Sequence, residues 1–168
     1  TVDIALKAAL TGHLVFSTLH TNDAPSSITR LVNMGTPNYL ISAALTLIMA
    51  QRLARKSCLD CRVLDENITP KLLNSIGFLP EQSARAKIYK GTGCEECSGS
   101  GYKGRMGIYE ILEIDNELKA GILSNLQQTE LNAIAKKNGF RTMQDMGQDL
   151  LLSGDLSFAE YERVLQSN

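Results

Sequence analysis

The apolar positions in the first third of the chain predict two helices on either side of one short strand. Residues 2–10 carry apolar side chains at helical spacing and run into Gly12, which is typical of a helix end. The run 13–20 has the length of a strand and is mostly apolar on both faces, as in a buried parallel strand. Capping residues and Pro25 then favour a helix over 24–33. This helix–strand–helix order indicates an open α/β sheet with crossover helices.

The middle of the chain predicts one long helix followed by a polar insert. Residues Asn38 to Lys56 are apolar for most of their length and end in basic side chains, which suit a helix C-terminus. The insert 65–85 contains one predicted helix over 70–76, and strands are expected at 86–89 and 105–114. The second of these strands would anchor the segment that precedes it.

After residue 115 the pattern becomes helical. Apolar side chains recur at positions i, i+3 and i+4 in four segments, 116–124, 128–138, 142–153 and 157–166. Ser157 is the expected N-cap of the last helix, and Glu160 is placed to complete a capping box. This part of the chain is therefore expected to form a bundle of short helices.

The four cysteines of the chain form two Cys-x-x-Cys pairs, Cys58 with Cys61 and Cys94 with Cys97. A gap of two residues lets both sulfurs of a tight turn face one ion, and two such pairs supply a closed tetrahedral zinc site. Thiolates are soft ligands that bind zinc well, and the ion imposes no competing geometry. The spacing therefore predicts one structural zinc ion held by these four residues.

Two disulfides, four unrelated thiols and an iron–sulfur cluster are the alternatives to zinc. Disulfides would need an oxidising compartment. No signal peptide is visible, and the chain starts with Thr-Val-Asp and no Met, as a cut fragment would. His13 and His20 do not stand near any cysteine in the sequence, so they are not included in the predicted metal site.

Composition limits the classes of partner. A chain of 168 residues allows one domain, or one with a small appendage, and a hydrophobic fraction of 43% is enough for a core. The 17 basic and 18 acidic residues nearly cancel, which disfavours a nucleic-acid partner or an anionic membrane surface. The longest apolar segment, 39–50, is too short to span a bilayer. A cytoplasmic, mixed α/β protein is expected.

Polar side chains gather at both ends of the predicted strand 13–20. Ligands of open α/β sheets bind beyond the carboxyl ends of strands, where His20, Thr21 and Asn22 are expected. His20 could donate a hydrogen bond to a phosphate oxygen, although an ordinary capped helix start with a satisfied histidine fits equally well. The sequence contains no Gly-x-x-x-x-Gly-Lys-Ser/Thr loop, and so lacks that cradle for the phosphates of a nucleotide.

Several stretches resemble the secretion ATPases, the traffic motors of type II secretion and type IV pilus assembly. The run Thr11–Asp23 (TGHLVFSTLHTND) resembles the histidine box of that family. The match continues through 28–35, 51–53, both cysteine pairs and 101–110, and is weakest after about Leu126. The cysteine pairs resemble the assembly or export branch, because the pilus-retraction motors of the family lack them.

This resemblance implies an α/β fold that forms the C-terminal part of a RecA-like P-loop ATPase core. It implies three segments: a core portion with the histidine box (1–57), a tetracysteine zinc subdomain (58–104), and a return strand with a C-terminal helical bundle (105–168). The Walker A loop, acidic box and Walker B segment of the family are expected to precede Thr1. ATP and magnesium would then be bound by the full-length protein, and the fragment alone is expected to be inactive.

Site residues and partners follow from the same resemblance. His20 resembles the histidine near the γ-phosphate, and His13 resembles its partner at the start of the strand. Thr21, Asn22 and Arg30 are implied to support nucleotide binding. The motors of this family are hexamers at the cytoplasmic face of the inner membrane. The implied partners are further copies of the chain, an inner-membrane platform protein and a cytoplasmic accessory protein.

A stand-alone zinc-binding interaction module is the alternative function. The stretch from Cys94 to Gly101 fits the Cys-x-x-Cys-x-Gly-x-Gly repeat of J-domain co-chaperones, which normally occurs in several copies and occurs here once. A nucleic-acid-binding zinc ribbon is disfavoured by the charge balance. The resemblance does not distinguish a secretion machine from a pilus, of which the mannose-sensitive haemagglutinin (MSHA) type is one possibility.

Overall fold

The computed structural model describes residues 2–166, which fall into two compact units. The first unit contains the residues up to Gln51 together with Tyr109–Thr142. The second contains Arg52–Ile108 together with the residues from Met143 onward. Each unit is thus built from two stretches that are distant in sequence, whereas the sequence analysis divides the chain into three consecutive segments.

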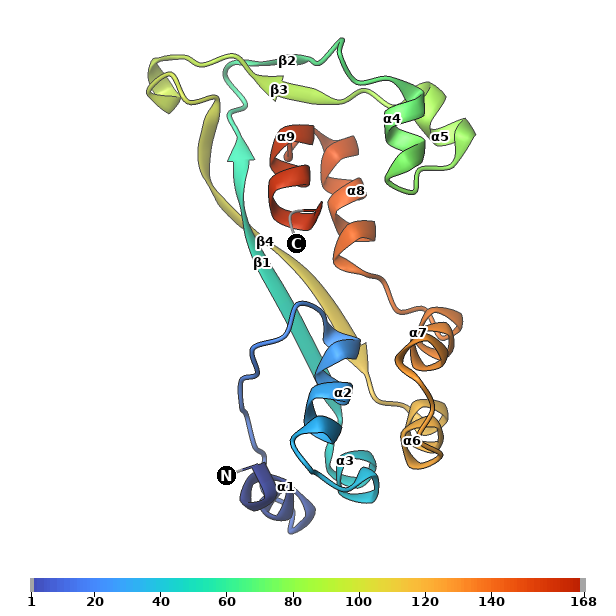
Figure 1. Ribbon diagram of the computed structural model, residues 1–168. Helices are drawn as coiled ribbons and strands as arrows, with labels where there is room; N and C mark the ends of the chain where they lie inside the picture. The colour runs from blue at the N-terminus through green and yellow to red at the C-terminus, as the bar shows by residue number, and fades with distance from the viewer. Residues whose placement is uncertain (1, 167–168) are drawn as a thin grey trace. The chain divides into compact units, whose positions relative to one another are not determined.

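Two long strands connect the units. Strands β1 (Leu47–Ser57) and β4 (Tyr102–Glu113) pair with each other, and each passes from one unit into the other (Figure 1). The Ile114 N–H, just after β4, donates to the Thr46 carbonyl oxygen, just before β1, at 2.9 Å. The start of β1 therefore lies beside the end of β4, and the two strands are antiparallel.

The prediction of one helix from Asn38 to Lys56 is wrong beyond Ala44. Helix α3 (Asn38–Ala44) ends there, and β1 follows. The residues of β1 include Leu, Met, Ala, Gln, Arg and Lys, which all favour helices, so local propensity is misleading here. Pairing with β4 gives β1 its hydrogen-bond partners and overrides that propensity. The strand predicted at 105–114 is confirmed as β4.

The strand predicted over 13–20 is also wrong, since these residues lie outside any helix or strand. Leu14 and Phe16 are 83% and 87% exposed instead of buried. A strand needs a neighbour to satisfy its backbone groups, and among the described residues β1 pairs only with β4 and β2 only with β3. Leu19, near the end of the run, does pack against the core of the first unit.

The first unit surrounds its part of the β1–β4 pair with amphipathic helices. These are α1 (Val2–Leu10), α2 (Ala24–Asn33), α3, α6 (Asn116–Leu123) and α7 (Gln128–Lys137). Apart from α3, each confirms its predicted helix to within a residue at either end. Their apolar faces share one core with β4, formed by Ala24, Ile28, Leu31, Ile41, Leu112, Ile114, Leu118, Ile122, Leu131 and Ala135. The core fixes α2 against the strand pair and against α7.

The second unit contains a short antiparallel strand pair, β2 (Arg62–Leu64) with β3 (Tyr89–Gly91). The strand expected at 86–89 thus begins about three residues later, and β2 was not predicted. The helices of this unit are α4 (Pro70–Ser75), α5 (Pro80–Arg85), α8 (Met143–Ser153) and α9 (Phe158–Tyr161), with a 3₁₀ turn η1 (Glu95–Cys97) and a π-helical turn η2 (Glu162–Gln166). Helix α5 was not predicted, and the helix expected over 157–166 divides into α9 and η2.

A buried carboxylate ties α9 to β1. Glu160 is fully buried, and its two oxygens accept five hydrogen bonds at 2.5–2.9 Å, three from Arg55 and two from Arg163. Burial alone would raise the pKa of Glu160, but the hydrogen bonds from the two arginines outweigh it and lower that pKa to about 2. The guanidinium of Arg55 also lies 4.1 Å from the centre of the Tyr102 ring. Helix α9 is thereby fixed to β1, and the same arginine contacts Tyr102 at the start of β4.

The predicted cap of this last helix is confirmed in part. Ser157 is the N-cap, since its Oγ accepts from the Glu160 N–H at 3.3 Å. The carboxylate of Glu160, expected to complete a capping box, is instead held by the arginines. A residue with good capping spacing is therefore used for a tertiary ion pair.

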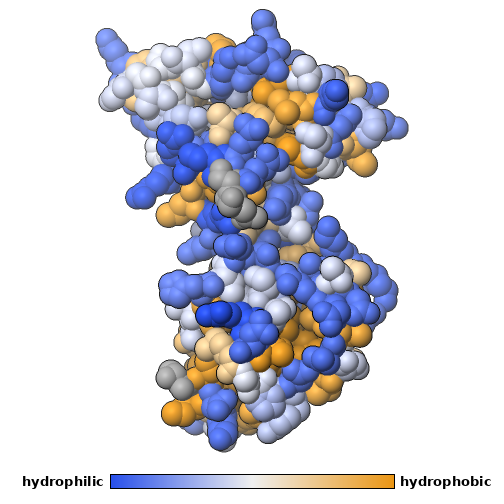
Figure 2. Space-filling view, viewed as in Figure 1, coloured by the Kyte–Doolittle hydropathy of each residue, from blue (hydrophilic) through white to orange (hydrophobic). Residues whose placement is uncertain are grey.

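Apolar side chains reach the surface in both units (Figure 2). In the first unit they include alternate residues of the long strands, with Leu47, Met49, Tyr109 and Ile111 between 39% and 54% exposed. Ile48, one residue out of phase, packs against the core instead. Among the described residues, the helices are too short or too polar to cross a lipid bilayer.

Replacing Glu160 with Gln should make the stability of the chain less dependent on pH. The folded-state pKa of about 2 lies below the ordinary value of 4.5, so the ionised group stabilises the fold above about pH 4.5 and loses this effect as the pH falls toward 2. The shift corresponds to about 3 kcal/mol. We expect Glu160→Gln to lower the free energy of unfolding by about that amount at pH 7 and by much less near pH 2.5. Urea denaturation of both proteins across this pH range measures the free energy of unfolding. A loss of stability in Glu160→Gln that does not change with pH would contradict the lowered pKa of Glu160.

Candidate functional site

The four cysteines lie in two tight turns of the second unit. Cys58 directly follows β1 and Cys61 directly precedes β2, while Cys94 is the N-cap of η1 and Cys97 is its last residue. All four are free thiols, and their Sγ atoms lie within 4.8 Å of one another. The structure therefore brings together the four residues that the spacing singled out.

The separations of the sulfurs suit a tetrahedral ion. The Sγ–Sγ distances are 3.8 Å for Cys58 and Cys94, 3.9 Å for Cys61 and Cys97, and 3.7 Å for Cys94 and Cys97. A tetrahedron with zinc–sulfur bonds of about 2.3 Å has edges of about 3.8 Å. A disulfide needs about 2.05 Å between the sulfurs, which none of these pairs approaches. The geometry fits a four-thiolate metal site.

Backbone amides stabilise the thiolate form of these sulfurs. Cys97 Sγ accepts from the N–H groups of Cys94 and Gly101, both at 3.2 Å, and Cys61 Sγ accepts from the Gly93 N–H at 3.3 Å. The amide of Cys94 is the largest influence on Cys97, whose pKa falls to about 6 although burial opposes the shift. Burial raises the pKa of Cys58. Hydrogen bonds from the surrounding backbone are typical of metal ligands, because they orient the ligand and tune its basicity.

Glycine is required where the two turns meet. Gly101 has φ +76°, its N–H bonds Cys97 Sγ, and its carbonyl oxygen accepts from the Cys58 N–H at 2.9 Å. A Cβ at Gly101 would lie 2.7 Å from the Gly91 carbonyl oxygen. Gly101 therefore links the second cysteine turn to the first through its backbone, which no residue with a side chain could do without strain.

The two histidines of the sequence analysis have different surroundings in the first unit. His13 is exposed just after α1, with Nδ1 3.1 Å from Thr11 Oγ1 and 3.3 Å from the Ala8 carbonyl oxygen. His20 is exposed four residues before α2. The N-cap of α2 is Asp23, whose carboxylate accepts from the Ser26 N–H at 2.7 Å, so His20 does not cap this helix.

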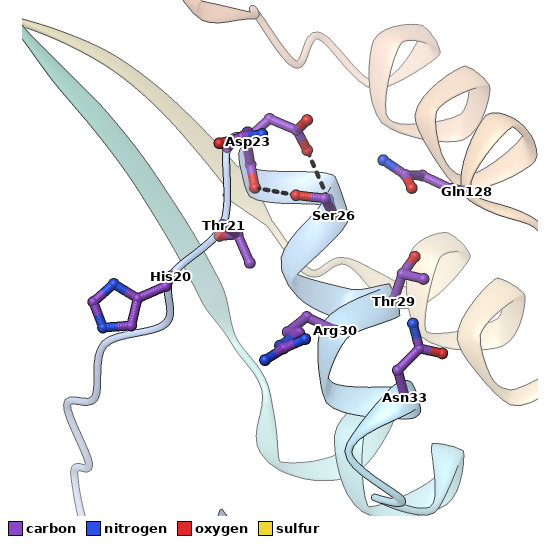
Figure 3. A pocket seen from close by; sticks show the side chains of 9 residues that line it. His20, Thr21, Asp23, Ser26, Thr29, Arg30, Asn33 and Gln128 are labelled. Carbon is purple, nitrogen blue, oxygen red and sulfur yellow. Dashed lines mark hydrogen bonds between the residues drawn. The ribbon is translucent and has the colours of Figure 1, made fainter. Parts of the chain in front are cut away.

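A hollow of about 310 Å³ lies along α2, between the segment that precedes the helix and α7 (Figure 3). Its lining is polar and is formed by His20, Thr21, Asn22, Asp23, Ser26, Thr29, Arg30, Asn33 and Gln128. Of the five residues implied by resemblance, four line this hollow, and His13 is not among the lining residues. Five lining residues were not predicted as site residues: Asp23, Ser26, Thr29, Asn33 and Gln128. Thr29 and Asn33 share the polar face of α2 with Arg30, and a helical wheel could have found them.

The first turn of α2 has no amide left for a ligand among its first three positions. The Ala24 N–H donates to Glu110 Oε1 at 2.5 Å, Pro25 has no N–H, and the Ser26 N–H is bound by Asp23. Two carboxylates thus occupy the end of the helix that otherwise attracts anions. Among the side chains that line the hollow, those of His20, Asn22 and Arg30 can donate hydrogen bonds to an anion.

Comparison with known proteins identifies relatives of this chain. Residues 1–163 match the profile of the family described as "Type II/IV secretion system protein". The chain is 43% identical over 160 residues to the type IV pilus assembly ATPase PilB of Thermus thermophilus, which is 95% of this chain and 18% of that protein. It is 35% identical over 164 residues to the type II secretion system protein HxcR of Pseudomonas aeruginosa, covering 98% of this chain and 31% of that protein. The chain thus spans less than a third of the length of these two relatives.

A solved structure shares the fold. The pilus retraction motor PilT with bound ADP superposes with a TM-score of 0.60 at 23% sequence identity, over 96% of this chain and 35% of that one. The mixed α/β fold is therefore similar to that of part of PilT. With a family profile that extends over nearly all of its residues, the chain belongs to the type II/IV secretion system protein family.

Proposed function

We propose that this chain is the C-terminal part of a hexameric ATPase that works at the cytoplasmic face of the inner membrane and drives type IV pilus assembly or type II secretion. Its relatives include proteins named for both processes, which supports the common role. The observation that carries the proposal is the polar hollow along α2, in which the histidine-box residue His20 and Arg30 lie beside a helix end already closed by carboxylates. The stand-alone co-chaperone-type module loses its support, because the family match includes the first unit as well as the cysteines.

In this proposal the phosphate-binding loop, the magnesium site and the catalytic carboxylate belong to the part of the full-length protein that precedes residue 1. The present chain contributes side chains on the far side of the nucleotide. His20 donates one hydrogen bond to the γ-phosphate, while Thr21, Asn22 and Arg30 support that contact from the hollow. Loss of the γ-phosphate would then affect the first turn of α2, a helix whose apolar face is part of the core. His13, whose Nδ1 lies near Thr11 and Ala8 at the end of α1, has a structural role.

Zinc is proposed as the ion of the four-cysteine site. The sulfur separations and the hydrogen bonds to sulfur support a closed, four-coordinate ion with no open position for water. The ion would fix the two ends of the segment 58–104 and would have a structural or partner-docking role. Inner-membrane platform and accessory proteins are the proposed partners, and an MSHA-type pilus is one candidate machine.

Metal analysis of the purified chain should find about one zinc ion per chain. We expect Cys61→Ser to abolish zinc retention during dialysis and to unfold the segment 58–104, because the binding energy of a structural site contributes to folding. Leu59→Ala is the matched control, since Leu59 lies in the same turn with 56% of its surface exposed and is not a ligand. A wild-type chain that holds no zinc and has paired thiols would refute the assignment.

The isolated chain should not hydrolyse ATP above background. Phosphoryl transfer needs a phosphate cradle and carboxylates that hold magnesium, and the sequence has no phosphate loop. Release of phosphate from ATP by the purified 168-residue chain checks this expectation. If the chain hydrolyses ATP and the His20→Ala variant of the same chain does not, the proposal that the phosphate loop and magnesium site lie outside this chain is wrong.

In the full-length protein, His20→Ala should lower the rate of ATP hydrolysis by about 10²-fold, the usual cost of one lost transition-state contact. The zinc content and the melting temperature should not change, because the side chain is exposed. His20→Asn should be impaired as well, because the shorter side chain does not reach the same phosphate oxygen. Steady-state ATPase rates with melting curves measure these effects, and near-normal turnover by the Asn variant would exclude phosphate sensing.

A further inference from the structure

We propose that Glu110 is a positioning residue that holds the first turn of α2, and with it the His20–Asp23 segment, in place for phosphate recognition. This inference rests on the proposed ATPase function. Glu110 lies in β4, 86 residues away from the helix it binds, and plays no part in the mechanism described so far.

The contact is buried on both sides. Glu110 is 3% exposed and Ala24 is fully buried, and the Ala24 N–H donates to Glu110 Oε1 at 2.5 Å. An ionised carboxylate is costly to bury unless it is hydrogen-bonded. A helix N-terminus compensates this cost twice, because the amide donates a charge-assisted hydrogen bond and the helix dipole favours negative charge there. The site therefore strongly favours one position of the helix end relative to the strand.

The segment before α2 depends on this position. Asp23 is bonded to Ser26 inside the first turn, and Thr21 Oγ1 lies 2.8 Å from Ser27 Oγ. Ser27 is itself 3% exposed. The side chains of Thr21 and Asp23 are thus attached to the turn that Glu110 holds, and His20 immediately precedes Thr21. A shift of the turn would be passed to the imidazole.

Glu110 also determines where a phosphate can bind. With the Ala24 and Ser26 amides bound to carboxylate oxygens, neither can donate to a phosphate, and the side chains of the hollow are the proposed donors. Without Glu110 the Ala24 amide loses its acceptor, and the helix end keeps only the carboxylate of Asp23. ATP would then bind as well as before, or better, but in a position less suited to the contact with His20.

A test in the full-length protein separates this role from general stabilisation. Glu110→Ala should lower kcat by about 10²-fold through misplacement of the site, with KM for ATP unchanged or lower. Glu110→Gln keeps an oxygen that can accept from Ala24, so its kcat should stay within about threefold of the wild type. Glu113 is the matched control, because it lies three residues further along β4 and is exposed. Glu113→Ala and Glu113→Gln should leave both constants unchanged.

Amide hydrogen exchange on the 168-residue chain gives a readout that does not depend on ATP turnover. Glu110→Ala should speed exchange at Ala24 and Ser26 by about tenfold or more, while Glu113→Ala leaves it unchanged. Unchanged exchange at Ala24 in Glu110→Ala, or a higher KM with an unchanged kcat, would overturn the proposal. If the full-length wild type does not hydrolyse ATP, the proposed function fails, and the exchange data alone then decide whether Glu110 holds the turn.

Discussion

A pair of β-strands is only marginally stable in water unless other elements pack on it or tie it down, and this limit governs both units. Strands β1 and β4 contribute residues to both units, so the strand pair must be stabilised separately in each unit. In the first unit the support is a shared apolar core in which Ile48 and Leu112 face the helices. In the second unit it is polar, with Arg55 of β1 bonded to the buried Glu160 of α9. The first cysteine turn follows the end of β1, and the second precedes the start of β4.

Two buried glutamates solve the same physical problem in different ways. Glu160 is neutralised by two arginines whose side chains remain about half exposed, which suits a permanent attachment. Glu110 accepts from a backbone amide at a helix end, where charge is balanced by the helix dipole. The first glutamate thus fixes structure, and the second links structure to the proposed chemistry.

The sequence was most informative where chemistry is encoded locally. Two-residue gaps predicted the cysteine cluster, and capping residues with helical periodicity predicted α1, α2 and the C-terminal helices. Prediction failed where the secondary structure depends on which segments pair. β1 contains mostly helix-forming residues but pairs with β4, and the apolar run 13–20 has no strand beside it in the described residues. Glu110 was missed for a related reason, since nothing local shows that its partner lies 86 residues away. Several residues of the hollow share one face of α2, which the sequence shows. That Gln128 also lines the hollow depends on how α7 packs against α2, which the sequence does not show.

The central claim is that side chains, and not the helix amides, meet the phosphate at α2. A structure of the full-length protein with ADP and beryllium fluoride, a mimic of the γ-phosphate, tests it most directly. We expect a His20 ring nitrogen to lie within about 3.2 Å of the fluoride group, while the Ala24 and Ser26 amides stay bound to Glu110 and Asp23. Amides of the first turn donating to the mimic, with His20 turned away, would contradict it.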